Sequence, residues 1–504
     1  MTTLWRDLAS LGLLGADRAV PGQALARKLA GLNLDMDTDL GEILLNAAAV
    51  IRLPVRVRTG ILPFEGRLPE PVRTDAGERP CTPKSARHLS DIISGKYPLA
   101  LEEFITVLAS RKMILPDEQL PGLFDQCIRD PELWPRIRQV VGSKGRWLSA
   151  RNPEWAALTD EPDPQRWPDA GKKERIAILL NTRQVDPAGA LALMQSTWSA
   201  DPPADRAAYL GALAESAGPD DEPFLAECAQ DRRKEVRQAA TAVLSLIPGS
   251  RVSTQLFDWA SGCITLNKSR IEIRLPAETP ADSADFGILP TPGSKGEGLK
   301  VSWLRQLLAN IPPDKWETYF QLNARQILAG FVQAKNSDAF LSGFATAAVR
   351  FRHSTWAESF IDIRSEDIWS GESGKKLAKL LTAEAFNRKT MELLRQEQLL
   401  AEGHPLTWVL CLAEHTWDKN LTLRLIRQFQ EHLATTKVYN WSSWHYRRIL
   451  EVAGYRSDPG LMEELRKNWP VQSPLWQRWE AEVERMMQTL HFRNRMISAA
   501  NEVK

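Results

Sequence analysis

Few residues in this sequence have the types and the spacing that phosphate binding or nucleophilic catalysis requires. Residues 142–145 and 293–296 both read Gly-Ser-Lys-Gly, but neither has the GxxxxGK[ST] spacing that gathers backbone N–H groups, Lys and Ser/Thr around a phosphate. We expect surface turns at both places. Ser373 and Lys376 are three residues apart, as in a serine–lysine nucleophile on one helix face, yet the glycines around them favour a solvated helix start.

Histidine and cysteine show no metal-ligand spacing. Four histidines crowd into one stretch but are 11, 17 and 13 residues apart, so no helix face holds them together: His404, His415, His432 and His445. We expect them to cap helices or to lie at the edge of the core. The five cysteines are far apart and form no CxxC pair, which favours a reducing cytoplasm. The sequence therefore predicts no cofactor.

The candidate partner-binding residues fall into two basic clusters. The first interleaves arginine with tryptophan: Arg146, Trp147, Arg151 and Trp155. The second follows Arg232: Arg233, Lys234 and Arg237. Aromatic and basic side chains together are typical of surfaces that grip nucleic acid, but a loop pinned by its tryptophans and a solvated repeat edge are the alternative interpretations. The formal net charge of +1 argues against a dedicated nucleic-acid binder.

The elements that position the second cluster carry an internal repeat. Three residues recur after 31 positions: Arg206, Ala208 and Leu213 reappear as Arg237, Ala239 and Leu244. In the second copy, apolar residues follow the 3.6-residue period of a helix that is buried along one side. Residues 231–240 resemble the second helix of a HEAT repeat, in which Asp caps the helix and small residues face the partner helix.

The fold class predicted from these patterns is all-α and α-solenoid-like, with HEAT-type helical hairpins and a small β-hairpin near 263–275. We expect four regions: a helical region 1–165, the repeat region 171–250, the β-hairpin with a flexible linker at 251–300, and a helical region 301–504. Proline and glycine predict loops at about 53–84 and 142–168. The 18 tryptophans predict dense packing, with Trp441/Trp444 and Trp476/Trp479 each sharing a helix face.

Three short strings carry a family resemblance. They are Leu-Leu-Gly at 13–15 with Arg18, Gly-Arg-Trp-Leu at 145–148 with Asn-Pro at 152–153 and Trp155, and Trp-Leu-Arg-Gln-Leu-Leu at 303–308 with Trp316. Together they resemble an uncharacterised bacterial family of long HEAT-like helical proteins. Such proteins are found near genes for a SWIM zinc-finger protein, a MoxR-type AAA+ ATPase and von Willebrand A-domain proteins. The resemblance implies a part in such an assembly and no particular reaction.

Our leading hypothesis is a non-catalytic scaffold or adaptor that binds a protein partner. The alternative is a HEAT-like nucleic-acid-binding protein or DNA-repair-type enzyme, which predicts a positive stripe along the concave face of 171–250. A hydrolase centred on residues 146–155 is a third hypothesis. No run of about 18 apolar residues and no basic, then apolar, N-terminal segment occurs, so we expect a cytoplasmic protein without a membrane span.

Overall fold

The computed structural model describes residues 3–15, 22–32, 34, 39–58, 70, 72, 75, 77–159, 162–267, 270–289, 297–363, 365–396, 404–436 and 445–501. Residues 293–296 and the pair Trp441/Trp444 lie outside this part of the chain. The chain divides into two compact units, Met1–Pro71 (unit 1) and Val72–Lys504 (unit 2). The predicted all-α, solenoid-like fold class is confirmed, and the four-region organisation stays a prediction.

Unit 1 consists of helices around a small apolar core. Its helices are α1 (Thr3–Leu14), α2 (Gln23–Ala30) and α3 (Leu40–Arg58). Leucine and isoleucine at helical spacing, such as Leu25 with Leu29, bury the sides that face each other. The loop predicted to begin at residue 53 is wrong at that end, because α3 continues through Pro54 to Arg58. A single proline removes one helix hydrogen bond, and near the end of a 19-residue helix the backbone bonds that remain are sufficient.

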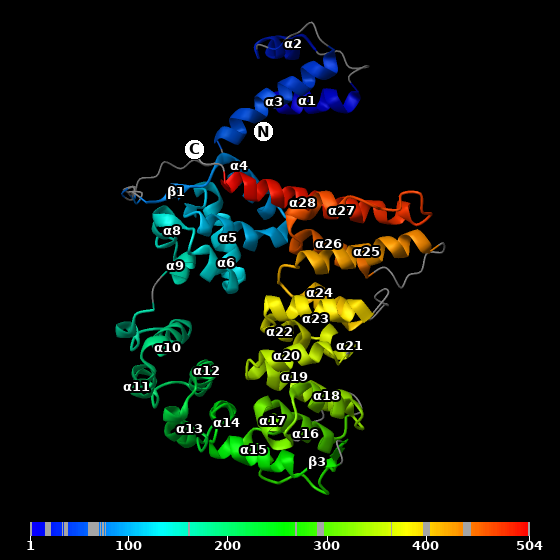
Figure 1. Ribbon diagram of the computed structural model, residues 1–504. Helices are drawn as coiled ribbons and strands as arrows, with labels where there is room; N and C mark the ends of the chain where they lie inside the picture. Colours follow the sequence, from blue (N-terminus) through cyan, green and yellow to red (C-terminus); the bar gives the residue numbers. More distant parts are fainter. Residues whose placement is uncertain are drawn as a thin grey trace. The chain divides into compact units, whose positions relative to one another are not determined.

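Unit 2 begins with a small bundle of helices (Figure 1). Its helices are α4 (Pro83–Ile93), α5 (Leu101–Ser110), α6 (Leu120–Arg129), α7 (Trp134–Ile137), α8 (Gly142–Ser149) and α9 (Pro153–Thr159). Two short parallel strands, β1 (Arg79–Pro80) and β2 (Met113–Ile114), join the segments before α4 and after α5. The loop predicted at 142–168 is wrong over α8 and α9. Gly142 and Pro153 occupy first helical positions, where proline costs no hydrogen bond.

Stacked helices follow over the predicted repeat region (Figure 1). They are α10 (Lys172–Val185), α11 (Pro187–Thr197), α12 (Pro203–Leu213), α13 (Glu222–Cys228), α14 (Lys234–Leu244) and α15 (Arg251–Ser261). Helix α12 packs against both α10 and α14, which makes α10, α12 and α14 consecutive members of one row. Side chains cap the N-termini of some of these helices. At the start of α11, for example, the Asp186 carboxylate accepts a hydrogen bond from the Gly189 N–H at 2.9 Å.

The predicted β-hairpin is present after α15. Strands β3 (Ile264–Asn267) and β4 (Arg270–Ile273) are antiparallel, with Ile264 opposite Ile273. Gly330 lets the hairpin dock on α18, because a Cβ there would lie 2.7 Å from Cδ1 of Ile271. Part of the predicted linker is packed: the indole N–H of Trp303 donates to Ser283 Oγ at 3.0 Å, and Ile288 is buried.

Closely packed helices form the rest of unit 2. They are α16 (Leu299–Ala309), α17 (Pro313–Phe320), α18 (Ala324–Val332), α19 (Ser337–Arg350), α20 (Ser354–Ile361), α21 (Glu366–Ser370), α22 (Glu372–Leu380), α23 (Ala383–Gln396), α24 (Pro405–Leu412), α25 (Lys419–Thr435), α26 (Tyr446–Arg456), α27 (Met462–Leu465) and α28 (Trp476–Asn501). Short 3-10 helices join elements throughout the unit: η1 (Pro98–Ala100), η2 (Asp117–Gln119), η3 (Pro131–Leu133), η4 (Pro164–Arg166), η5 (Pro219–Asp221), η6 (Ser283–Phe286) and η8 (Pro459–Leu461).

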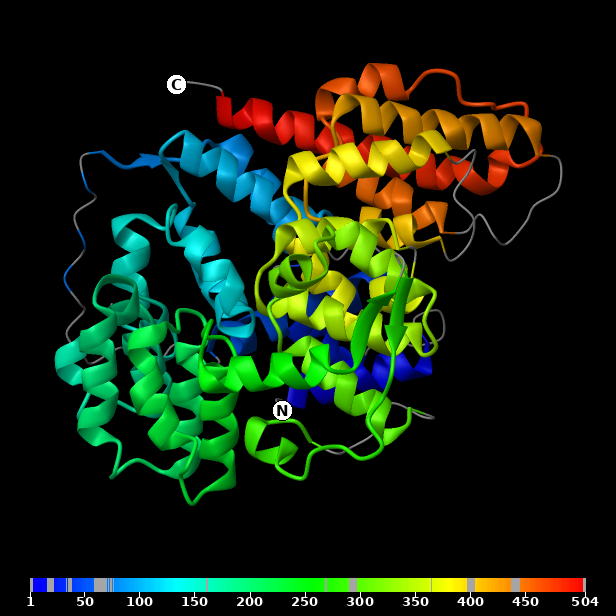
Figure 2. The same ribbon diagram turned by 60° about the horizontal axis from the view of Figure 1, so that its bottom comes forward.

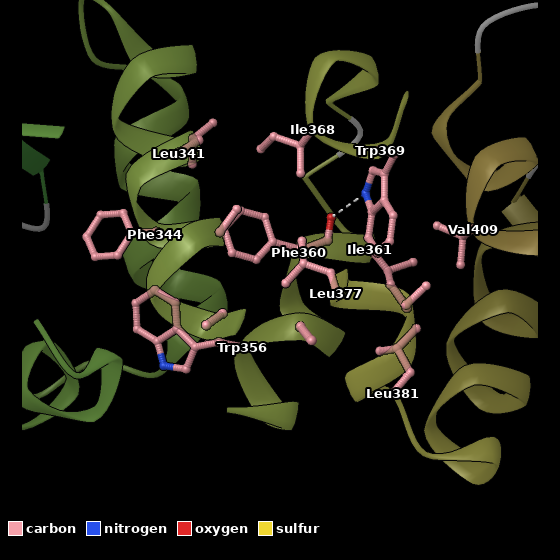
Figure 3. Close-up of a cluster of buried hydrophobic side chains, with 14 of the residues drawn as sticks. Leu341, Phe344, Trp356, Phe360, Ile361, Ile368, Trp369, Leu377, Leu381 and Val409 are labelled. Atoms are coloured by element: carbon pink, nitrogen blue, oxygen red, sulfur yellow. Dashed lines mark hydrogen bonds between the residues drawn. The ribbon is translucent and has the colours of Figure 1, made fainter. Parts of the chain in front are cut away.

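Tryptophan cements the packing of these helices, as Figure 3 shows for side chains from α19 to α24. Trp356 stacks on Phe344 with ring centroids 5.2 Å apart. Trp369 is fully buried and satisfies its N–H by donating to the carbonyl oxygen of Phe360 at 3.2 Å. Trp479 is also buried, in accordance with the packed role predicted for its helix face.

The last helix, α28, packs against both ends of unit 2. It contacts α26 and also α4 and α5, which lie some 400 residues earlier in the chain (Figures 1 and 2). Met486 and Leu490 belong to the large core cluster, whereas Phe492 and Met496 belong to the core of the N-terminal bundle. The apolar side of one helix therefore completes two cores.

A buried arginine fixes α28 in this position. The guanidinium of Arg493 donates to both carboxylate oxygens of Glu103 on α5, at 2.6 and 2.7 Å. It also donates to the carbonyl oxygens of Gly454 and Ser457, at 2.8 and 2.7 Å. The Arg493 side chain is only 4% exposed, so each donor needs such a partner.

We predict that Glu103→Gln lowers the free energy of unfolding by about 3 kcal/mol, because it leaves a buried guanidinium without its counter-charge. Urea unfolding of the full chain measures this. The control is Glu102→Gln, whose exposed ion pair with Arg136 is worth less than about 1 kcal/mol. Equal losses for the two variants would show that the buried pair does not hold α28.

Candidate partner-binding surfaces

A nearly buried cluster of Arg175, Asp201 and Trp167 joins α10 to the start of α12. We call such an arginine–aspartate pair beside a tryptophan a rung. Arg175 on α10 donates through Nη1 to Asp201, which precedes α12, at 2.6 Å. The guanidinium lies 5.3 Å from the ring centroid of Trp167 and donates through Nε to the Trp167 carbonyl at 2.8 Å. Both charged side chains are nearly buried, at 11% and 8% exposed, so the rung fixes the spacing of neighbouring repeats.

The same arrangement recurs 31 residues later. Arg206 on α12 donates to Asp231 at 2.8 Å, and its guanidinium lies 5.4 Å from the ring centroid of Trp198. Arg175 is thus a third copy of the repeat position that sequence comparison found only at Arg206 and Arg237. The 31-residue spacing of Trp167 and Trp198 was the signal that would have revealed it.

Arg237 occupies the same position on α14 but makes no ion pair with an aspartate among the described residues. It donates instead through Nη1 to the carbonyl oxygens of Asp231 and Arg232, at 2.8 and 3.1 Å. Arg233 and Lys234 are exposed at the start of α14, and within the described part of the chain neither side chain makes an ion pair. Of the three partner-binding residues predicted in this second cluster, Arg237 therefore has a structural role, and Arg233 and Lys234 are exposed to solvent.

The first predicted cluster comes together at α8 and α9, and part of it is engaged within the protein. The Trp155 indole donates to Asp125 at 2.9 Å and packs beside Phe124. Arg151 lies over the ring of Trp147, 4.1 Å from its centroid, and donates to the Trp147 carbonyl oxygen at 3.1 Å. Arg146 and Arg151 are the exposed members of this cluster, whereas Trp147 and Trp155 are half-buried.

Residues 142–145 form the first turn of α8, so the surface turn predicted there is wrong. Gly142 begins the helix with φ +71°, and Ser143 and Gly145 are buried. The Glu78 carboxylate accepts from the Ser143 N–H and, at 2.7 Å, from Ser143 Oγ. Arg146 lies close to the same carboxylate, at 3.6 Å. The helix start, which attracts anions, is thus occupied by the protein's own Glu78.

The four clustered histidines have separate local roles. His404 caps α24 by accepting from the Leu406 N–H at 3.2 Å, and His432 Nδ1 lies 3.1 Å from Thr436 Oγ1. His415 and His445 lie against the rings of Phe386 and Tyr446, respectively. Among the described residues, no three His, Cys, Asp or Glu side chains gather as they would around a metal ion.

Neither the Ser373–Lys376 pair nor the buried cysteines Cys228 and Cys411 have the surroundings of an activated nucleophile. Ser373 and Lys376 lie in the first two turns of α22, beside the buried Gly374, as a helix start predicts. Burial raises the pKa of Cys228 and of Cys411 to about 12, so both thiols are protonated at neutral pH. Neither cysteine is poised as a nucleophile.

A groove of about 480 Å³ lies between α12, α14 and the turn after α19. Small residues at helical spacing line it: Gly211, Ala214 and Ala217 from the α12 side, and Ala239 and Ala242 from α14. We call this set, with Arg350 and Arg352, the repeat groove. Because glycine and alanine side chains do not extend far from the helix backbone, the backbone or a small side chain of a ligand could approach both helices closely.

Two arginines, Arg350 and Arg352, and one carboxylate, that of Glu215, line one end of the repeat groove, which therefore has a net positive charge. Arg350 donates to the Ala242 carbonyl at 2.5 Å and to Ser245 Oγ at 2.8 Å, and within the described chain it makes no ion pair. Burial lowers the pKa of Arg350 to about 10, so it stays charged at neutral pH. Arg352 is exposed, at φ +51°, and lies 3.8 Å from Glu215.

The repeat groove is not apparent from the sequence, because its arginines follow α14 by about a hundred residues. The small residues at 211, 214 and 217 and at 239 and 242 were the available signal, since spacings of three place them along one side of each helix. The arginines carry no local pattern that links them to those helices.

These observations define an all-α protein of stacked helices whose repeat rows are joined by arginine–aspartate rungs. The chain belongs to DUF5691, a family of unknown function, which matches residues 7–500. No curated protein and no solved structure matches the chain significantly. In the part of the chain that the structure describes, no helix is both long and apolar enough to cross a membrane.

We predict that Asp201→Asn lowers the free energy of unfolding by about 3 kcal/mol, because Arg175 would be left nearly buried without a carboxylate. Asp205→Asn is the matched control: its partner Lys172 is 43% exposed, and the loss should stay below about 1 kcal/mol. Urea unfolding followed by tryptophan fluorescence measures both. If the Arg175–Asp201 pair did not stabilise the fold, Asp201→Asn and Asp205→Asn would lower the free energy of unfolding by similar, small amounts.

Proposed function

We propose that this protein is a non-catalytic helical-repeat adaptor whose repeat groove receives an acidic segment of a protein partner. The observation that carries the proposal is Arg350, a half-buried cation without an ion-pair partner in the described chain. Removing a cation from water is costly unless an anion compensates it. A carboxylate from a partner would supply that compensation at the positive end of the groove.

The floor of the repeat groove supports the same proposal. Alanine and glycine provide an apolar surface that loses little side-chain entropy on binding, so a segment lying on it is stabilised mainly by close packing. The exposed guanidinium of Arg352 lies 3.8 Å from the exposed carboxylate of Glu215, a weak surface pair that a carboxylate of the partner can replace. A slim acidic segment therefore matches the groove in both shape and charge.

The distribution of arginine favours a protein partner over nucleic acid. Arg175 and Arg206 are neutralised by aspartate, and Arg237 donates to backbone carbonyls. The exposed basic side chains on these helices that make no ion pair within the described chain, among them Lys173, Arg233 and Lys234, are few. Nucleic-acid binding needs many phosphate contacts to be strong, so it is the second candidate function.

The resemblance noted in the sequence suggests where to look for the partner. We propose that MoxR-type AAA+ ATPases and von Willebrand A-domain proteins be tested first, and that the assembly forms in the cytoplasm. This part of the proposal rests on the resemblance alone.

Site-specific crosslinking tests the groove directly. We predict that p-benzoylphenylalanine in place of Gly211 gives one dominant protein adduct in the native host, mapped by mass spectrometry to an acidic segment. Space above Gly211 is open, so the substitution displaces no neighbour. Gly122 on α6 is the matched control, because it is also exposed, helical and open, and should give no such adduct.

Charge reversal provides the second arm of the test. Arg352→Glu should reduce the adduct formed at position 211 at least about tenfold, since it places a carboxylate beside the acidic segment. Equal adducts at 211 and 122, an adduct that ignores Arg352→Glu, or crosslinking to nucleic acid alone would each contradict the proposal.

A further inference from the structure

A second cavity lies between α4 and α28 and shares no lining residue with the repeat groove. Its volume is about 600 Å³, and it is bounded by one side of each helix. Arg87 and His88 face it from α4, and His491 and Arg495 face it from α28. His491 and Arg495 are four residues apart and therefore lie on the same side of α28.

Positive charge in this cavity is largely uncompensated. The carboxylate that lines it, Asp91, is already paired with Lys96 at 2.5 Å. Within the described residues, neither Arg87 nor Arg495 makes a hydrogen bond or an ion pair. Burial and the nearby charge of Arg495 lower the pKa of His88, as expected in a positive environment. This concentration of cations contrasts with the net charge of +1 for the whole chain.

The cavity also has an apolar wall. Tyr97 and Phe492 stack with ring centroids 3.9 Å apart, and both line the cavity. Its volume falls in the range of about 300–1,000 Å³ that is typical of small-molecule sites and far exceeds what a single phosphate needs. The combination of two guanidinium groups, two imidazoles and an aromatic wall suits a ligand that carries both phosphates and an organic group.

We propose that the cavity between α4 and α28 binds a phosphate-bearing small molecule of nucleotide size. Arg87 and Arg495 hold the phosphates from opposite helices, and His88 and His491 donate further hydrogen bonds. Because α28 completes both cores of unit 2, such a ligand contacts the junction between the ends of that unit. This inference is independent of the repeat groove and of any partner bound there.

Calorimetric titration of the full chain with ATP, pyrophosphate and inorganic phosphate, without magnesium, tests the inference. We expect one site per chain, with ATP bound more tightly than pyrophosphate and phosphate weakest. The double variant Arg87→Gln/Arg495→Gln should raise the dissociation constant for ATP at least about tenfold, because each removes a charge-assisted hydrogen bond. Arg111→Gln, an exposed arginine outside the cavity, should leave it unchanged.

Thermal unfolding of each variant shows whether it is folded, and Arg87→Gln alone serves if the double variant is not. Pyrophosphate bound as tightly as ATP would show that the organic body is not recognised and would overturn the assignment of a nucleotide-sized ligand. Absence of binding for all three probes at millimolar concentration would overturn the site itself, as would an unchanged affinity in the arginine variants. Binding of an oligonucleotide but of no small probe would assign the cavity to a nucleic-acid surface instead.

Discussion

Burial of the Arg493 guanidinium is the interaction on which unit 2 depends. An arginine stays charged in a protein interior, so its donors must meet fixed acceptors. Here the acceptors come from α5 and from the end of α26, two segments separated by about 350 residues. Satisfying the donors of this one side chain therefore requires that the last helix of unit 2 return to the first helices of the same unit, with α28 lying against both cores.

Arginine recurs as a structural residue throughout the unit. The repeat rungs use Arg175 and Arg206, and a fully buried pair joins Arg183 of α10 to Asp221 before α13. We interpret these pairs as devices that fix register, since a hydrophobic contact would tolerate sliding between helices of similar surface. Cations that are already paired within the fold are not available to a ligand, whereas Arg350 and the arginines that line the cavity between α4 and α28 make no ion pair within the described chain.

The local parts of this structure could be predicted from sequence, because they depend on neighbours in the chain. The 31-residue repeat identified α12 and α14, and alternation in β-branched residues identified the hairpin β3–β4. The third repeat copy was missed because Thr182 stands where the other two copies have leucine. Prolines and glycines misled the prediction of loops, since Pro54 lies within α3, and Gly142 and Pro153 begin helices.

The repeat groove and the cavity between α4 and α28 could not be predicted from sequence, because both form between helices that are far apart in the chain. Helical periodicity tells which side of a helix is buried, but not which distant helix covers it. Arg87 and Arg495 each look like a solvated residue in sequence, and only the packing of α28 on α4 makes them face one cavity. The repeat groove likewise depends on Arg350 reaching α14 from the end of α19. Of the predicted site residues, Trp155 and Arg237 were recognised as notable for their types, whereas their structural roles required the tertiary contacts.

Native-state hydrogen exchange of the full chain, measured over a series of low denaturant concentrations, tests most directly whether α28 makes the ends of unit 2 one body. The contacts of α28 predict that amides of α5 and α28 exchange through a common opening, with the same free energy and the same dependence on denaturant. Exchange of α5 through a separate, smaller opening while α28 stays protected would contradict the account.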